Sequence, residues 1–345
     1  MNPYNRGMTP TKVAPATKPG PTIADAMRAY LHTVRMARSE HTARTYSNGL
    51  NTFGGVLTAH WLDPAETAVE KLTEDGLVWL SAHLKRYAPA TERLYLNATM
   101  GFYTYLSAEH LAEISLPRLR QLLKQRSRRP GARLPQFPIG DIQRVIKAVL
   151  TETTSSKSPE LVRLRAARDR AFILALADTG LRVHEACGLR RGDVDWNEAR
   201  AVVIGKGDTQ AVVRFSARSI RALKEYLALR ARMDGVSGRR LTSLPLFARH
   251  DKGAGKRLKP ITTTTGRTIV SETVRRVLGA EAEGRITPHS FRHYFVTTAL
   301  RGSGNLKLAQ ALARHRNIQV TQRYAHLSDD ELDRGYHEIF EEGER

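Results

Sequence analysis

Four short segments of the chain hold side chains whose types and spacing could carry chemistry. In "TGLRVHEACG", Arg182 precedes Glu185 by three residues, so on a helix the carboxylate could hold the guanidinium fork for a bidentate phosphate contact. Taken alone, the pair is better read as a surface ion pair worth little free energy. In "VIGKGDTQ", Gly205 and Gly207 let the backbone approach a ligand, so Lys206 could reach a phosphate, although such a lysine is more often simply exposed.

The third segment, "TPHSFRHYFVTTAL", predicts a helix whose first turns carry His289, Arg292 and His293. His289 and His293 have the spacing of a zinc-binding helix, but Ser290 replaces the expected glutamate and no third ligand is evident. A metal site is therefore the weaker interpretation. A histidine and an arginine three residues apart near a helix start form a good anion-binding pair.

The fourth segment, "ARHRNIQVTQRYAHL", is basic and holds no acidic residue. Tyr324 lies nine residues after His315 in it. Together the four segments supply arginines, a lysine, histidines and a tyrosine, but no carboxylate in an obvious acid–base role. Such a set suits metal-free phosphoryl transfer: cations neutralise the transition state, the tyrosine hydroxyl attacks, and a lysine or histidine protonates the departing oxygen.

In this order the segments resemble the tyrosine recombinase (phage integrase) family. The family pattern is Arg, Lys, His-x-x-Arg, His or Trp, and Tyr, and the matching residues here are Arg182, Lys206, His289, Arg292, His315 and Tyr324. The resemblance spans roughly residues 22–340, and the helical first part, with "EHTARTYSNGL", looks like the family's core-binding domain. Because only about twenty residues precede that part, we expect the simple two-domain type of recombinase.

The resemblance implies a role for each matching residue. Tyr324 would attack the scissile phosphate to give a 3′-phosphotyrosyl link and a free 5′-hydroxyl. Arg182 and Arg292 would clamp the nonbridging oxygens, and Lys206 would be the general acid for the leaving 5′-oxygen. Because the bond energy stays in the phosphotyrosine, the resemblance implies neither ATP, nor metal, nor any other cofactor.

Three further positions belong to the same expectation. The resemblance implies that His289 and His315 hydrogen-bond the phosphate and help to move protons, and that Glu185 supports the first arginine. The family usually has glycine before the second histidine, whereas this chain has Arg314. That arginine could crowd the turn or add a phosphate contact.

Composition agrees with a DNA-binding enzyme but does not prove one. The chain of 345 residues has 55 Lys and Arg against 34 Asp and Glu, a formal net charge of +21. This excess favours a polyanion such as nucleic acid; a generally basic proteome or a membrane-lipid partner would give the same balance. No apolar run is long enough for a membrane span or signal peptide, and Cys187 is the sole cysteine, so we expect a reducing, cytoplasmic, nucleoid-associated protein.

Hydrophobic periodicity predicts a mainly α fold with a small antiparallel sheet. Apolar residues at helical spacing indicate helices opened by Thr22, Ser39 and Thr73, another in "ATERLYLNATMGFYTYL", and no strand before residue 130. "ARAVVIGKGDTQAVVRFSA" predicts a hairpin, "SLPLF" a short strand before a basic glycine-rich loop, and most of the remainder helices. With the resemblance, these elements predict an all-helical core-binding domain and an α+β catalytic domain forming a C-shaped DNA clamp.

We place the domain boundaries by composition and pattern. Residues 1–21 are a predicted flexible tail, 22–125 the helical (SAM-like) DNA-binding domain, 126–137 a basic linker, 138–327 the catalytic domain and 328–345 a C-terminal helix. The linker region carries cations of one sign and is predicted to cross a phosphate backbone, although most charge runs are merely solvated. The candidate DNA contacts are Arg118, Arg120, Lys124, Arg126, Arg128, Arg129 and Arg133.

The expected partner is double-stranded DNA with a specific recombination site. The apolar stripe of the C-terminal helix favours packing on its own domain, whereas the resemblance implies docking on a neighbouring protomer in a DNA-bound tetramer of subunits that are monomers when free. Whether accessory directionality factors also take part stays an open question. We weigh three alternatives: a type IB topoisomerase-like enzyme, a non-catalytic basic DNA-binding protein, and a nucleophile pair of Cys187 and His184, whose spacing arises often by chance.

Overall fold

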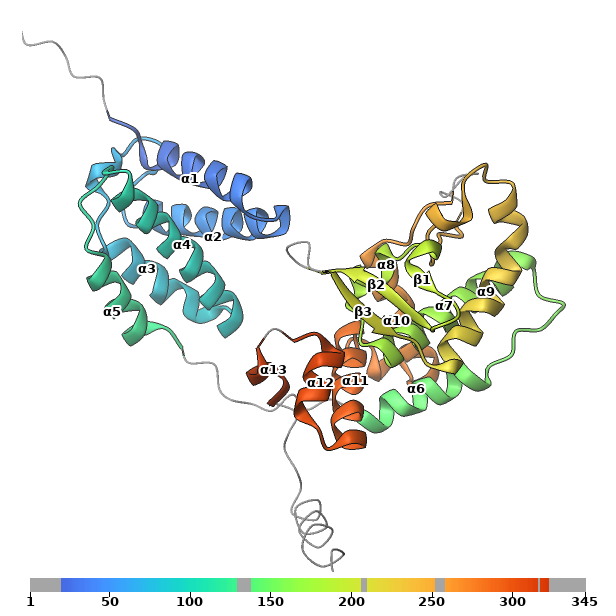
Figure 1. Ribbon diagram of the computed structural model, residues 1–345. Coiled ribbons are helices and arrows are strands. Elements are labelled where there is room, and N and C mark those ends of the chain that lie inside the picture. Colours follow the sequence, from blue (N-terminus) through green and yellow to red (C-terminus); the bar gives the residue numbers. More distant parts are fainter. Residues whose placement is uncertain (1–19, 129–137, 206–209, 252–257, 316, 323–345) are drawn as a thin grey trace, which may run out of the picture. The chain divides into compact units, whose positions relative to one another are not determined.

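The computed structural model describes residues 20–128, 138–205, 210–251, 258–315 and 317–322. The chain divides into two compact units, residues 1–132 and 133–345 (Figure 1). The finer domain boundaries stay predictions. None of the helices in the described ranges is long and apolar enough to cross a membrane.

The first unit is a helical bundle, and no strand ladder occurs in residues 20–128, as predicted. Thr22 and Asp25 cap each other reciprocally at the first helix, and Ser39 caps the second. The apolar faces meet around Phe53, Phe102 and other fully buried side chains. Its elements are α1 (Ile23–Ala37), α2 (Glu40–Ala59), η1 (Val69–Lys71), α3 (Asp75–His83), η2 (Leu84–Arg86), α4 (Pro89–Ala108) and α5 (Leu116–Arg126).

In this unit one predicted cap is wrong and one helix was not predicted. Thr73 does not cap α3, because the N-cap is Glu74 and no side chain caps the helix there. The Thr73 carbonyl instead accepts a 2.7 Å hydrogen bond from the Tyr103 hydroxyl, and the Glu74 carboxylate accepts from the Ser115 backbone. Sequence reasoning also missed α5, whose charges hid the apolar spacing that buries Leu119.

The second unit surrounds the buried helix α7. An unbroken run from Ala171 to Ala177 is buried, which explains why α7 shows no single apolar face. Helices α6, α9, α10 and α11 pack against it. The helices and turns are α6 (Ile139–Thr151), α7 (Glu160–Thr179), α8 (Val183–Gly188), η3 (Arg191–Asp193), α9 (Ala217–Gly235), η4 (Leu241–Ser243), α10 (Thr263–Leu278), η6 (Ala280–Ala282), α11 (Pro288–Ser303), α12 (Leu306–Ala313) and α13 (Ile318–Gln322).

A small antiparallel sheet of order β1-β2-β3 completes the unit. The predicted hairpin is present as β2 (Arg200–Ile204) and β3 (Gln210–Arg214), with Val202 opposite Val212. The sequence did not reveal β1 (Val194–Asp195), which is only two residues long. The strand predicted in "SLPLF" is wrong: Pro245 and Ala248 form only isolated bridges, with Arg190 and Pro260. Single backbone hydrogen bonds to Leu189, Arg191 and Ile261 hold the segment without a strand ladder.

Candidate active site

Gly180 ends α7 and begins the turn that carries Arg182. Its φ of 60° lies in the left-handed region, and a Cβ here would come within 2.4 Å of the Phe295 ring. Two residues later Arg182 is the N-cap of α8, and its backbone N–H donates to the Glu185 carboxylate at 2.9 Å. The turn therefore requires glycine at 180 and aims Arg182 outward.

Arg182 and Glu185 are not a surface ion pair. Nη1 of Arg182 donates to Oε1 of Glu185 at 2.9 Å, but the carboxylate side chain is 1% exposed whereas the arginine side chain is 45% exposed. Burial raises the pKa of Glu185, but the Arg182 N–H and the charges of Arg314 and Arg182 outweigh it and leave the pKa below its ordinary value. Glu185 is thus a buried anion that holds a solvent-facing guanidinium.

Arg292 lies in the first turns of α11, and its side chain is buried. Its guanidinium donates to the carbonyl oxygens of Gly180 and Ala313. The same side chain therefore joins the end of α7 to the end of α12, which lies beside α11 in Figure 1.

The predicted histidines meet near these arginines. The rings of His289 and His293 contact edge to face at a centroid distance of 4.2 Å. Burial, followed by the charges of Arg292 and Arg182, lowers the pKa of His289. Burial, His289 and Arg292 lower the pKa of His293 to about 4, so both rings favour the neutral form near pH 7.

His315 follows α12 and joins the same cluster. Its Nδ1 lies 2.8 Å from the Thr321 hydroxyl on α13, and its backbone carbonyl accepts from the Gln310 amide at 3.0 Å. Burial, followed by the charges of Arg292 and Arg182, lowers its pKa to about 4. His315 is therefore positioned and neutral near pH 7. Sequence reasoning missed Thr321, which is fully buried and stands in no recognisable motif.

Arg314 adopts the conformation that normally calls for glycine. It is the C-cap of α12 with φ 56° and ψ 43°, a left-handed geometry that costs a residue with a Cβ about 1 kcal/mol. Its side chain turns inward, is 11% exposed and lies 3.1 Å from Oε2 of Glu185. A longer hydrogen bond of 3.4 Å reaches the Gly180 carbonyl. Arg314 therefore does not displace His315.

Two predicted catalytic residues, Lys206 and Tyr324, lie outside the described residues. The chain is described up to Gly205 after β2 and up to Gln322 at the end of α13. Their roles stay predictions. In the described ranges, no group of three or more His, Cys, Asp or Glu side chains could hold a metal ion.

The candidate DNA contacts of the linker region differ in their surroundings. Arg118 approaches Glu74 at 3.8 Å, and Arg128 donates to buried Glu92 and to the carbonyls of Leu84 and Tyr87. The exposed residues of this set on α5 are Arg118, Arg120, Lys124 and Arg126, whereas Arg129 and Arg133 lie outside the described residues.

Cys187 is a poor nucleophile in this structure. It is buried, and its thiol donates to the Thr262 carbonyl at 3.5 Å. Burial raises its pKa to about 12, so the thiol stays protonated at neutral pH. The alternative that paired Cys187 with His184 therefore loses its reactive group.

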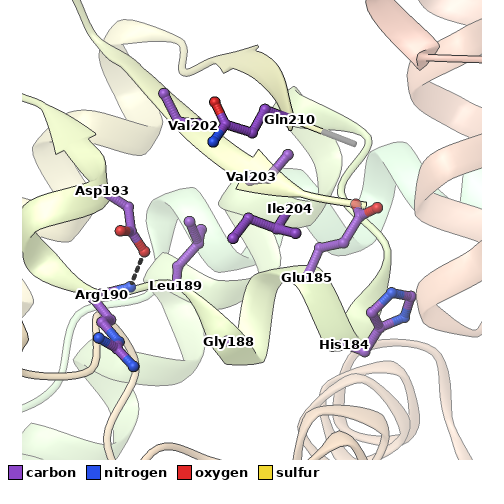
Figure 2. Close-up of a pocket in the computed structure, with 10 residues that line it drawn as sticks. All are labelled: His184, Glu185, Gly188, Leu189, Arg190, Asp193, Val202, Val203, Ile204 and Gln210. Carbon is purple, nitrogen blue, oxygen red and sulfur yellow. Dashed lines mark hydrogen bonds between the residues drawn. The ribbon is translucent and has the colours of Figure 1, made fainter. Parts of the chain in front are cut away.

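A hollow of about 510 Å³ adjoins α8 and β2. Figure 2 shows His184 and Glu185 at one end, Arg190 and Asp193 at the other, and the side chains of β2 across from them. Of the predicted site residues that the structure describes, only Glu185 lines it. The hollow therefore borders the arginine–histidine cluster without forming it.

The model of the phage integrase family matches residues 145–331. The chain belongs to this family. Tyrosine recombinase XerC of Mycobacterium sp. (strain KMS) is 30% identical over 316 residues, which cover 89% of this chain and 94% of that protein. Tyrosine recombinase XerC of Myxococcus xanthus is 27% identical over 314 residues, with 91% and 96% covered. The chain is thus a tyrosine recombinase by family, as the order of its motifs predicted.

Solved structures share the fold. A XerH site-specific recombinase bound to palindromic difH substrate has a TM-score of 0.67 at 19% identity, covering 92% of this chain and 84% of that one. A lambda integrase(75-356) dimer bound to a COC′ core site has a TM-score of 0.57 at 15% identity, covering 88% and 95%. The predicted fold, mainly helical with a small antiparallel sheet, is confirmed.

Proposed function

We propose that this tyrosine recombinase cuts and rejoins DNA at a specific site through a 3′-phosphotyrosyl intermediate and a Holliday junction. The observation that carries the proposal is the arginine–histidine cluster. Arg182, Arg292 and two neutral histidines, His289 and His315, gather where α7, α11 and α12 end or begin. Such a set binds and neutralises a phosphate in its transition state without a metal ion.

In the proposed step the Tyr324 hydroxyl gives its proton to neutral His289 or His315, and its oxygen bonds to phosphorus. The bond from phosphorus to the 5′-oxygen breaks, and that oxygen takes a proton from Lys206. Attack by a 5′-hydroxyl from another strand reverses these changes and releases the tyrosine. Because the phosphodiester is exchanged for a phosphotyrosine and not hydrolysed, its bond energy is kept and the reaction needs no ATP.

The arginines and histidines of the cluster would stabilise the charge on the phosphate in different ways. The exposed guanidinium of Arg182, held by ionised Glu185, supports a bidentate contact with nonbridging oxygens. Buried Arg292 adds a fixed positive charge from behind. Neutral His289 and His315 can each accept or donate a hydrogen bond as charge moves between the attacking and leaving oxygens.

The proposal extends to the partners. We expect double-stranded DNA as the substrate, because related structures contain recombinases bound to DNA sites and this chain carries a net charge of +21. The exposed cations of α5 would contact phosphates. Four copies would assemble on two sites, with residues 328–345 docking on a neighbouring protomer, in the nucleoid-associated setting that such a substrate implies.

A nicked suicide substrate tests the proposed chemistry. The cognate site is first selected from a randomised duplex library on the immobilised protein. Wild type should then form a covalent adduct in EDTA, and Tyr324→Phe should form none, whereas the control Tyr95→Phe in the helical unit should react like wild type. An adduct that persists in Tyr324→Phe would overturn the assignment of the nucleophile.

A further inference from the structure

Arg314 contacts both groups that anchor the proposed phosphate-binding arginines. Its Nη2 lies 3.1 Å from Oε2 of Glu185, the oxygen that accepts the Arg182 backbone N–H at 2.9 Å. The same nitrogen reaches the Gly180 carbonyl, which also accepts from Arg292. One side chain therefore links the two anchors.

Arg314 keeps this position despite two unfavourable features. Its backbone is left-handed, where glycine would be unstrained. Its guanidinium is almost fully buried beside other cations, and, among the described residues, its Nε has no hydrogen-bond partner. A buried guanidinium is costly unless a carboxylate balances it, and Glu185 is the carboxylate in contact.

The position of Arg314 in the chain gives this contact a consequence. It directly precedes His315, and the Ala313 carbonyl on its other side accepts from Arg292. A side chain tethered at Glu185 therefore fixes the turn that presents His315 relative to α8. Because 11% of the side chain is exposed, little of it is left to contact DNA.

We propose that Arg314 is a positioning residue, which acts through Glu185 and Gly180 to hold Arg182 and His315 in register for attack on the phosphate. The proposal rests on the proposed function and deepens it. Glu185 becomes a shared anchor for two arginines instead of the support for one. The Arg314 side chain thereby ties the turn before His315 to Glu185, which a glycine at this position could not do.

Single-turnover cleavage of the nicked suicide substrate by the full chain at saturating DNA tests the proposal. Arg314→Met keeps length and removes charge, so the cleavage rate should fall by about 10- to 100-fold. Arg314→Lys should recover part of the rate, because it restores a donor and a charge near Glu185. The exposed control Arg232→Met, at the end of α9, should cleave like wild type.

Two further measurements separate positioning from other roles. A direct phosphate contact would lower the slope of log affinity against log salt by about 1 when removed, and Arg314→Met should leave that slope unchanged. In the double variant Glu185→Gln/Arg314→Met, cleavage should be no slower than in Glu185→Gln alone, because the two side chains act as one unit. Thermal unfolding tests whether each variant is folded.

The outcomes are distinct. A wild-type cleavage rate in Arg314→Met, a reduced salt slope, or multiplied rate losses in the double variant would each overturn the positioning role. If wild type forms no adduct, the proposed function fails instead. Because Arg314→Gly relieves the left-handed strain, it provides a second variant where Arg314→Met does not fold, and it should also cleave more slowly than wild type.

Discussion

Each of the two units contains a buried glutamate that binds two cations, and the two glutamates serve different ends. Glu92 in α4 and Glu185 in α8 both have side chains that are 1% exposed. Glu92 accepts from Lys85 at 2.8 Å and from Arg128, and Glu185 accepts from Arg182 and Arg314. In each case the surrounding donors hold the pKa of the carboxyl below its ordinary value against the effect of burial.

The difference lies in what the bound arginines do with their remaining donors. Arg128 donates also to the carbonyls of Leu84 and Tyr87, so it closes the helical unit on itself. Arg182 keeps much of its guanidinium at the surface, and Arg314 turns inward to stiffen the turn that bears His315. A buried carboxylate therefore stabilises a fold when its cations bond inward, and it prepares a binding site when one cation faces solvent.

We expect the largest effect on cleavage from removing the charge of Glu185, and almost none from removing that of Glu92. Glu185→Gln leaves Arg314 buried without a counter-charge and loosens Arg182, so single-turnover cleavage should fall by about 100-fold. The matched Glu92→Gln should lower the free energy of unfolding by about 1–2 kcal/mol and leave cleavage by DNA-saturated enzyme near wild type. Cleavage rates and thermal unfolding measure both. Equal losses of cleavage in the two variants would contradict the comparison.

Acid should affect the two units unequally. The second unit holds His250, His293 and His315, whose pKa values are lowered to about 3, about 4 and about 4, mainly by burial. The unfolded chain protonates these rings near pH 6.5 while the folded protein does not, so their stability contribution is full above pH 6.5 and is lost as the pH falls towards 4. We expect about 1 kcal/mol lost per histidine between pH 7 and 5.5.

Hydrogen exchange of the full chain at pH 7 and 5.5, corrected for intrinsic rates, measures this effect. Protection of α7, α9 and α11 should fall more than that of α1, α2 and α4, since the only histidine described in the helical unit with a lowered pKa is His83. His250 lies away from the arginine–histidine cluster and is hydrogen-bonded to Tyr226. Because glutamine does not titrate, the variant His250→Gln should lose less protection between pH 7 and 5.5 than wild type does. A uniform loss of protection would contradict the prediction.

The smallest effect concerns the basic run. Lys124 is exposed on α5, so Lys124→Ala should weaken DNA binding at all sequences and lower the salt slope by about 1. Arg128→Ala should leave the slope nearly unchanged and lower the unfolding temperature, because its donors bond inside the unit. Fluorescence anisotropy over a salt series tests both. If Arg128→Ala lowered the salt slope more than Lys124→Ala does, Arg128 would be a DNA contact after all.

Local patterns predicted most of the elements. The caps at Thr22 and Ser39 and the hairpin are stabilised by neighbours in sequence, and the structure confirms them. The errors arose where distant partners decide. At the start of α3 the Thr73 carbonyl accepts from distant Tyr103 and the Glu74 carboxylate from distant Ser115, and Glu74 is the N-cap in place of Thr73. β1 forms only because β2 pairs with it.

The residue types and their order were enough to predict phosphoryl transfer by an attacking tyrosine, because that chemistry depends on which groups the chain carries. The family assignment followed from the same motifs, and the fold class followed from hydrophobic periodicity together with the resemblance. Only the tertiary structure revealed that Glu185 serves both Arg182 and Arg314, and that Arg292 joins two helix ends. Burial and left-handed turns are set by packing between segments far apart in the chain, which the local pattern around Arg314 does not report.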